Sequence, residues 1–296
     1  MTPNWKHFQI DTSLDNRITI WIDVAERSVN VLFEAVFDEL VSILEHLTQL
    51  DSARPLLFRS AKRKGFVVGA DLRRILEIES DEESQAFLLH GQRALMRLEE
   101  YPCDTIALIQ GPCLGGGLEL AMACNYRIAC DSPETTLGMP ESKLGLMPGW
   151  GGTQRLIEIA GIANGLQMLV DGESICCDRA FGIHLVDALL DADRYETGAT
   201  EFIRQLSSRR VAGIDSQREQ LKSDLRESFE TWRLSHSGLF LSSQAAICKA
   251  VETGILVSRE AGYRAERELF FPLLCNASVR EALQRFAGGL KKSTET

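Results

Sequence analysis

The segment from Gly111 to Leu156 constrains the fold more than any other part of the chain. Three consecutive glycines, Gly115 to Gly117, join the apolar run TIALIQ to the helix-forming run LELAMAC. A strand, a glycine turn and a helix in succession bring backbone N–H groups to a helix N-terminus, where a ligand atom can approach because glycine has no Cβ. We therefore expect a ligand-facing amide at Gly116.

Two glutamates accompany glycine turns in this segment. Glu119 falls in the first turn of the expected helix, and Glu141 follows 22 positions later, ahead of Gly149, Gly151 and Gly152. Taken singly, the glycines could form a tight turn, Glu119 could interact with the helix dipole, and Glu141 could be a solvated loop residue. A carboxylate in an apolar helix is costly unless it is paired or used, however. Together these features suggest an acid/base pair facing backbone donors.

A second candidate donor lies upstream, in SAKRKGFVVGA. Lys62, Arg63 and Lys64 form the densest cationic run, and Gly69 with Ala70 precedes another expected helix. The cations could face a phosphate or could form an ordinary solvated turn. A carbonyl that becomes an enolate needs two hydrogen-bond donors, and the Ala70 N–H is our candidate for the donor that accompanies Gly116.

Composition indicates an ordinary globular protein. The chain has 296 residues, 45% of them hydrophobic, which suits one large domain or a domain with a helical extension. Its net charge of −10 argues against a general nucleic-acid or anionic-membrane surface. We find no secretory pattern and no apolar run long enough to span a bilayer, and expect a cytoplasmic protein. The eight cysteines lack CxxC spacing, so we expect neither a metal site nor a disulfide framework.

Hydrophobic periodicity predicts alternating strands and helices in the first part of the chain. We expect a strand at 17–23, an amphipathic helix capped by Asn30, and a buried strand at 55–59. This order is typical of parallel pairing in an α/β fold. Further elements are expected as a helix from near Asp71, a helix at 82–99, a strand at 105–110, and two short helices at 152–160 and 164–170.

The strand signals stop near residue 190. Beyond it, helical patterns run from 191 to about 232, from 242 to 257 and from 258 to 286. We therefore divide the chain into a core domain at 1–190 and a helical extension at 191–296.

Three segments resemble the signature segments of the crotonase (enoyl-CoA hydratase/isomerase) superfamily and occur in the same order as they do in that superfamily. They read FVVGADL, GPCLGGGLELAMACNYRIA and LGMPESKLGLMPGWGGTQRL, and weaker similarity extends from about Phe8 to Asp187. The runs SVNVLFEAVFDEL and GYRAERELF further resemble the hydratase portion of multifunctional fatty-acid β-oxidation α-chains. The resemblance implies an α/β fold, a spiral of ββα units with a C-terminal helical region used in packing or oligomerisation, and acyl-CoA thioesters as ligands.

The resemblance also implies roles for individual residues. By motif position, Ala70 and Gly116 would supply the oxyanion-hole amides, and Gly149 would donate its N–H near the reacting water. Glu119 would act as the base on water and Glu141 as the acid at Cα. The implied activity is 2-trans-enoyl-CoA hydratase; a Δ3,Δ2-enoyl-CoA isomerase and a non-catalytic subunit of a β-oxidation assembly are the alternatives.

Ligands and partners follow from the same resemblance. Coenzyme A is part of the substrate, so we expect no separate cofactor. Its phosphates would be met by Lys62, Arg63 and Lys64, with Ala70 and Asp71 also beside the ligand. Family members imply a homo-oligomer, a trimer or hexamer. No GxGxxG motif is present, so NAD chemistry is not expected here. Either the chain is a free-standing hydratase, or a dehydrogenase or thiolase is a separate partner.

Two positions depart from the family pattern, and one alternative chemistry can be set aside. Asn125 replaces a usual aspartate, and Trp150 is larger than the usual residue in its turn, so a structural hydrogen bond and the acyl pocket are both affected. No GxSxG motif is present, and His184 with Asp187 has no nucleophile beside it. Serine hydrolase chemistry is therefore not expected.

Overall fold

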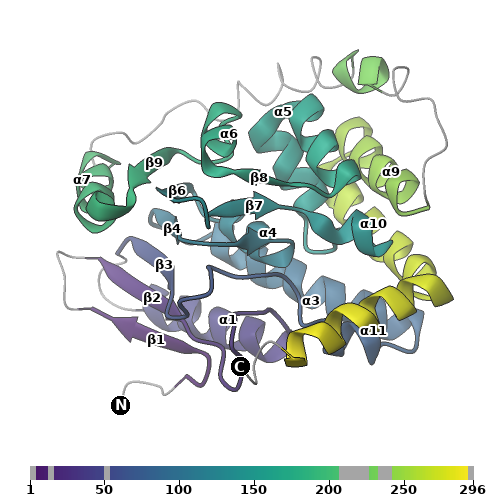
Figure 1. The fold of residues 1–296 in the computed structure, drawn as a ribbon, viewed down its shortest axis with the longest axis horizontal. Coiled ribbons are helices and arrows are strands. Elements are labelled where there is room, and N and C mark those ends of the chain that lie inside the picture. The colour runs from purple at the N-terminus through teal and green to yellow at the C-terminus, as the bar shows by residue number, and fades with distance from the viewer. Residues whose placement is uncertain (1–4, 13–16, 50–53, 207–226, 233–241, 293–296) are drawn as a thin grey trace.

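A six-stranded sheet forms the centre of the protein in a computed structural model that describes residues 5–12, 17–49, 54–206, 227–232 and 242–292. The sheet has the strand order β1-β2-β3-β4-β6-β9 (Figure 1). Its strands are β1 (Phe8–Asp11), β2 (Ile18–Ile22), β3 (Leu56–Ser60), β4 (Thr105–Ile109), β6 (Tyr126–Asp131) and β9 (Ala188–Asp191).

Parallel pairing dominates this sheet. Only β1 and β2 pair antiparallel; β2 with β3, β3 with β4, β4 with β6 and β6 with β9 are parallel. Helix α1 (Glu34–Thr48) connects β2 to β3 and buries an apolar face that includes Phe37 and Leu40. The predicted strand, helix, strand order with parallel pairing, and hence the α/β class, are confirmed.

A smaller three-stranded sheet lies next to the cavity described below. Its order is β5-β7-β8, from β5 (Cys113–Leu114), β7 (Thr136–Gly138) and β8 (Ser174–Cys176). Strand β5 leads directly into α4 (Gly116–Met122), and β7 leads into the 3-10 helix η1 (Pro140–Leu144). Because β5 and β7 pair in parallel, the segments after them leave the sheet side by side.

The remaining helices cover the sheets. They are α2 (Leu72–Leu76), α3 (Asp81–Glu99), α5 (Gly152–Asp171), α6 (Cys177–Gly182), α7 (Tyr195–Leu206), α9 (Ser242–Leu256), α10 (Arg259–Leu274) and α11 (Ala277–Lys292), with a 3-10 turn η2 (Ala192–Arg194).

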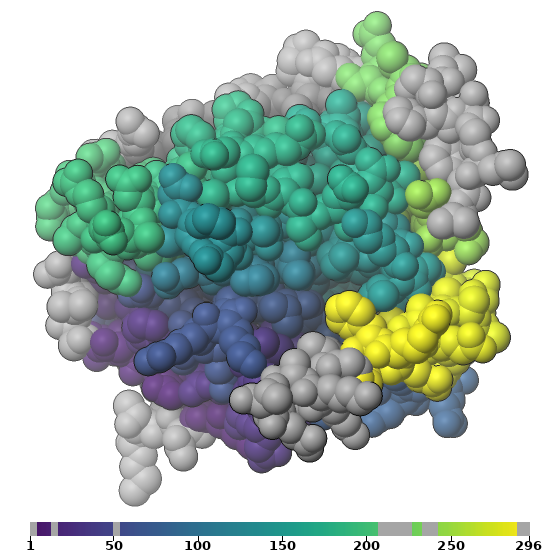
Figure 2. All heavy atoms as spheres, in the orientation of Figure 1, coloured from purple at the N-terminus to yellow at the C-terminus, as the bar shows by residue number. Residues whose placement is uncertain are grey.

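The C-terminal helices pack onto the rest of the protein. Helix α9 packs on α5 and α10, and α10 packs on both α3 and α5. Helix α11 contacts α2 and η1, and Figure 2 shows it in yellow on the surface of the protein. The last described strand ends at Asp191, and the division into domains at 1–190 and 191–296 stays a prediction.

Two details differ from the sequence-based expectations and one agrees. Asn30 does not cap α1, because its buried amide donates to Ile22 O and Phe66 O and accepts from Val24 N; the N-cap residue is Phe33. The two short helices expected at 152–160 and 164–170 are confirmed, because the span of α5 is interrupted by a kink at Gly161, whose φ of +77° and ψ of 167° are not helical. The helix expected at 258–286 is two, α10 and α11. Most of the helical pattern between 207 and 232 lies outside the described residues.

All eight cysteines are free thiols. No group of three or more histidine, cysteine, aspartate or glutamate side chains in the described ranges is arranged to hold a metal ion. Among the helices that the structure describes, none combines the length and apolar character needed to cross a bilayer.

Candidate active site

A cavity of about 810 Å³ lies where β5, α4 and η1 meet α2, α3 and the C-terminal helices. Its apolar wall includes Val31, Ile75, Phe87, Leu88 and Met147, together with Phe270 of α10 and Phe286 of α11. All five predicted catalytic residues, Ala70, Gly116, Glu119, Glu141 and Gly149, line this one cavity. The structure therefore brings together residues that are up to 79 positions apart in the sequence.

The two predicted amide donors lie close together. Gly69 O accepts from Leu32 N and Asp71 N donates to Leu32 O, both at 2.9 Å, so the N–H of the intervening Ala70 points to the other side of this bridge. Gly116 is the first residue of α4, where an N–H has no partner within the helix. A Cβ placed on Gly116 would lie 3.4 Å from Ala70 N. The two N–H groups can therefore converge on one ligand oxygen.

Glycine is required at this helix start for two separate reasons. Gly115, the N-cap residue of α4, has φ +50° and ψ −125°, a conformation that residues with a side chain avoid. A Cβ on Gly116 would lie only 2.4 Å from the Trp150 ring. The glycine triplet is thus explained by backbone conformation at one position and by close packing at the next.

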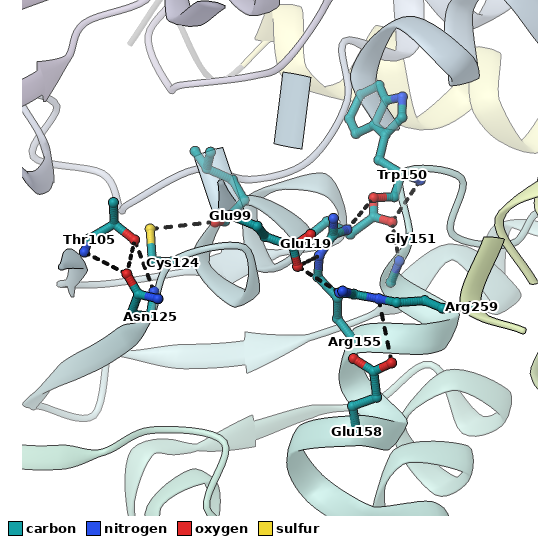
Figure 3. Close-up of polar contacts among 12 residues, drawn as sticks. Glu99, Thr105, Glu119, Cys124, Asn125, Trp150, Gly151, Arg155, Glu158 and Arg259 are labelled. Atoms are coloured by element: carbon teal, nitrogen blue, oxygen red, sulfur yellow. Dashed lines mark hydrogen bonds and ion pairs between the residues drawn. The ribbon is translucent and has the colours of Figure 1, made fainter. Parts of the chain in front are cut away.

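Glu119 is held by the turn that precedes α5. Its side chain extends from the first turn of α4, and the residue is 2% exposed. Its Oε1 accepts hydrogen bonds from Trp150 N at 2.8 Å and Gly152 N at 2.7 Å; Figure 3 shows the contact between Glu119 and Trp150. Burial raises the pKa of Glu119 well above its usual value, and the charges of Glu266 and Glu141 add to this effect, while the two amide donors oppose it.

Glu141 reaches the same cavity from η1 but without comparable support. Its Oε2 is buried and has no hydrogen-bond partner in the described part of the protein. Its Oε1 lies over the start of α4, since a Cβ on Gly115 would be 2.5 Å from it. Burial raises the pKa of Glu141 to about 7. Glu141 is therefore a carboxyl group that can gain or lose a proton near neutral pH.

A third buried carboxylate, Glu266 of α10, was not anticipated from the sequence. It is fully buried and accepts hydrogen bonds from Gly151 N at 2.8 Å and Thr153 N at 3.1 Å. Burial raises its pKa to about 7. One signal could have found it: Glu266 lies on the buried face of an amphipathic helix, four positions after Gly262 and four before Phe270.

The other predicted site residues have structural partners. Asp71 caps α2 by accepting from Arg73 N at 3.1 Å, forms an ion pair with Arg27 at 2.8 Å and lines the cavity. Gly149 O accepts from Gln92 Nε2 at 2.9 Å. A Cβ on Gly149 would lie 2.5 Å from Leu88 Cδ2, so glycine permits close packing against α3.

The cationic run is not part of the cavity wall. Lys62 forms an ion pair with Asp23, and Arg63 and Lys64 are exposed. The cations that line the cavity among the described residues are Arg27, Arg73 and Lys143, and none of them was among the predicted phosphate ligands. The role of Lys62, Arg63 and Lys64 in binding phosphate stays a prediction.

Both departures from the family pattern have visible consequences. Asn125 Oδ1 accepts from Thr105 N at 2.8 Å and Thr105 Oγ1 at 2.9 Å, which ties the start of β4 to the segment before β6 (Figure 3). The Trp150 ring is buried and packs edge-on against Phe37 with centroids 4.8 Å apart. Trp150 thereby fills space beside Gly116 that a smaller residue would leave to a ligand.

His184 and Asp187, considered above for serine hydrolase chemistry, lie away from the cavity. His184 is exposed in the turn after α6, at φ +61°. Asp187 accepts from Arg127 N at 2.8 Å and forms an ion pair with the Arg127 guanidinium at 3.1 Å. Neither residue lines the cavity.

Several solved structures have the same fold. An enoyl-CoA hydratase from Bacillus anthracis is 25% identical with a TM-score of 0.62, and the match covers 96% of each chain. An enoyl-CoA hydratase from Mycobacterium avium subsp. paratuberculosis is 20% identical with a TM-score of 0.68, covering 96% of this chain and 100% of the other. DspI from Pseudomonas aeruginosa is 22% identical with a TM-score of 0.62, covering 96% and 94%.

A comparison of the sequence with family models also points to enoyl-CoA hydratases. The model described as enoyl-CoA hydratase/isomerase matches residues 17–253, which include the six site residues Ala70, Asp71, Gly116, Glu119, Glu141 and Gly149. The match spans well over half of the chain, and the predicted crotonase-like fold with its C-terminal helices is confirmed. The protein therefore belongs to the enoyl-CoA hydratase/isomerase family.

Proposed function

We propose that the protein is an enoyl-CoA hydratase, a lyase that adds water across the double bond of 2-trans-enoyl-CoA thioesters in fatty-acid β-oxidation. The observation that carries this proposal is the pair of buried glutamates, Glu119 and Glu141, in one cavity with the Ala70 and Gly116 amides. Hydration must take a proton from water and deliver a proton to carbon, so it needs two such groups. Membership of the family supports the same class of reaction.

The two amides would bind the thioester carbonyl oxygen. Hydrogen bonds from Ala70 and Gly116 withdraw electrons from the conjugated C2–C3 double bond and make C3 electrophilic. When water oxygen bonds to C3, the π electrons move toward the carbonyl and a negative charge develops on its oxygen. Donors fixed in advance at that oxygen lower the barrier because they need no reorganisation during the reaction.

The proton transfers divide between the glutamates. Glu119 takes a proton from the attacking water, which leaves hydroxyl on C3. Glu141 gives its proton to C2 as the enolate collapses back to the thioester, and solvent exchange then restores both side chains. Two amide donors on Glu119 Oε1 favour its charged form, whereas Glu141 Oε2 lacks a partner among the described atoms and suits a carboxyl group that carries a proton.

Binding of the coenzyme A phosphates is a separate part of the proposal. The chain carries a net charge of −10, so local cations must meet the pyrophosphate and 3′-phosphate. We retain Lys62, Arg63 and Lys64 as candidates and add Arg73 and Lys143, which line the cavity. Charge reversal at all three residues of the 62–64 run should raise KM for crotonyl-CoA with little change in kcat. An unchanged KM would remove this run from the proposal.

The decisive experiment follows the loss of absorbance of crotonyl-CoA with the purified protein. Hydration of the conjugated double bond supports the proposal. Activity only with a 3-enoyl-CoA would identify an isomerase, and no turnover by a folded protein would indicate a non-catalytic subunit. Assembly as a trimer or hexamer, a dehydrogenase or thiolase partner, and the relation to multifunctional α-chains remain predictions.

A further inference from the structure

The turn formed by residues 150–153 presents four successive backbone N–H groups to two carboxylates. Trp150 N and Gly152 N donate to Glu119 Oε1, while Gly151 N and Thr153 N donate to Glu266. The donors alternate along the chain, so two carboxylates from different helices, Glu119 of α4 and Glu266 of α10, bind the same turn. The conformation that serves Glu119 is therefore also the conformation that Glu266 binds.

Glu266 is surrounded by donors. Its Oε2 accepts from Gly151 N and from Gln92 Nε2 at 3.1 Å, and its Oε1 accepts from Thr153 N and the Thr153 hydroxyl. That hydroxyl in turn accepts from Gln154 Nε2 at 2.8 Å, which leaves its own proton for Glu266. Four donors match the acceptor sites of an ionised carboxylate. Breaking these contacts would leave buried N–H groups unpaired, which is costly.

Other contacts fix the same turn but do not replace Glu266. Gln92 of α3 donates to Gly149 O and Tyr263 O, and Arg155 of α5 donates to Trp150 O at 2.5 Å. These groups bind carbonyl oxygens in or next to the turn and, through Tyr263, one of helix α10. The N–H groups of Gly151 and Thr153, by contrast, depend on Glu266.

Rotation of one peptide unit in this turn would redirect the neighbouring N–H groups. Trp150 N and Gly152 N flank Gly151 N in the chain, so the plane of each peptide constrains the next. We propose that Glu266 is a positioning residue for the hydration of the enoyl thioester: it fixes the 150–153 turn so that two amides meet Glu119, and it makes helix α10 part of the active site. This inference rests on the proposed function for its kinetic consequences, whereas its structural consequence can be measured without substrate.

The test compares Glu266→Gln with Glu268→Gln, an exposed residue on the same helix. Glutamine at position 266 keeps the size of the side chain but replaces one acceptor oxygen with a donor, so Thr153 N or Gly151 N loses its partner. Hydrogen exchange of the peptide covering 149–156 should become markedly faster in Glu266→Gln and stay at the wild-type rate in Glu268→Gln. Equal protection in the two variants would overturn the proposal.

The kinetic arm uses the same two proteins. We expect kcat for crotonyl-CoA to fall by about 10- to 100-fold in Glu266→Gln with KM within about twofold, because the Ala70–Gly116 amides and the apolar wall are untouched. A general loss of structure would instead impair binding as well. Wild-type kcat in Glu266→Gln would overturn the proposal; an inactive wild-type protein would refute the hydratase assignment but leave the exchange result valid.

A second variant covers the case in which Glu266→Gln does not fold. Thr153→Val removes one donor to Glu266 Oε1 and changes the side-chain volume little. It should accelerate exchange in the same peptide and lower kcat several-fold at unchanged KM. Wild-type exchange and kcat in Thr153→Val would count against a role for the Glu266 contacts.

Discussion

Glu119 and Glu141 are the same residue type in the same cavity, yet their surroundings differ. Glu119 Oε1 accepts two backbone N–H groups, from Trp150 and Gly152, whereas Glu141 Oε2 accepts none from the described residues. Burial raises the pKa of both side chains. The hydrogen-bond donors are the difference on which the proposed division of roles rests, because donors stabilise the anionic form of Glu119 against the effect of burial and Glu141 Oε2 has no such help.

The largest expected effect comes from removing either proton-transfer group. Glu119→Gln and Glu141→Gln should each lower kcat for crotonyl-CoA by about 10²- to 10⁴-fold, the usual contribution of an acid or base. Glutamine at 119 can still accept from Trp150 and Gly152, so the turn should survive. Calorimetric titration with butyryl-CoA checks that binding changes little. Near-normal hydration by either variant would break the two-glutamate comparison.

A smaller loss is expected from the Gly116 amide, which lines the same cavity as both glutamates. Gly116→Ala places a Cβ 2.4 Å from the buried Trp150 ring, so either the start of α4 or this ring must shift, and we expect the Gly116 N–H to lose its alignment with the thioester oxygen of the proposed complex. We expect kcat to fall by about 10²- to 10³-fold, the cost of losing one oxyanion donor. Gly182→Ala is the matched control, because a Cβ there meets nothing within 4 Å. Similar kcat values for the two variants would argue against an oxyanion hole at Gly116.

The smallest effect concerns stability rather than rate. Burial raises the Glu141 pKa from 4.5 to about 7. The free energy of unfolding therefore decreases as pH rises from about 4.5, because the charged form is less stable in the folded protein than in the unfolded chain, and the full decrease is reached above pH 7. Glutamine does not ionise. Glu141→Gln should therefore gain stability over wild type as pH rises from 5 to 8, by about 1–3 kcal/mol.

Urea unfolding at pH 5 and pH 8 measures this gain. The exposed Glu268→Gln variant supplies the baseline, since its charge is already solvated. A difference between Glu141→Gln and wild type that is the same at both pH values would show that Glu141 does not ionise at a cost in the folded protein.

The motif residues could be predicted from sequence because local backbone chemistry dictates them. The Gly115–Gly117 turn, Glu119 in the first helical turn and the Ala70 turn all follow from short patterns, and the structure brings them to one cavity. Alternating strands and helices likewise predicted the parallel sheet.

What could not be predicted depends on contacts distant in sequence. Glu266 lies 147 positions after Glu119, and no short pattern connects the two. Asparagine is a common residue at helix N-caps, yet the Asn30 amide instead donates hydrogen bonds to β2 and to the segment before α2. The 62–64 run was chosen for charge density, but charge density does not indicate whether a side chain faces the cavity or solvent.

The hydrogen bonds from Gly151 and Thr153 to Glu266 also bear on when the protein can become active during its synthesis. A ribosome extends the chain from the N-terminus at about 5–20 residues per second, and N-terminal parts fold first. The two glutamates at 119 and 141 and both amide donors emerge well before residue 266. A nascent chain therefore passes through a period in which every proposed reacting group has been made but the partner of Gly151 N and Thr153 N has not, so the proposed role of Glu266 predicts that activity starts only when helix α10 is complete.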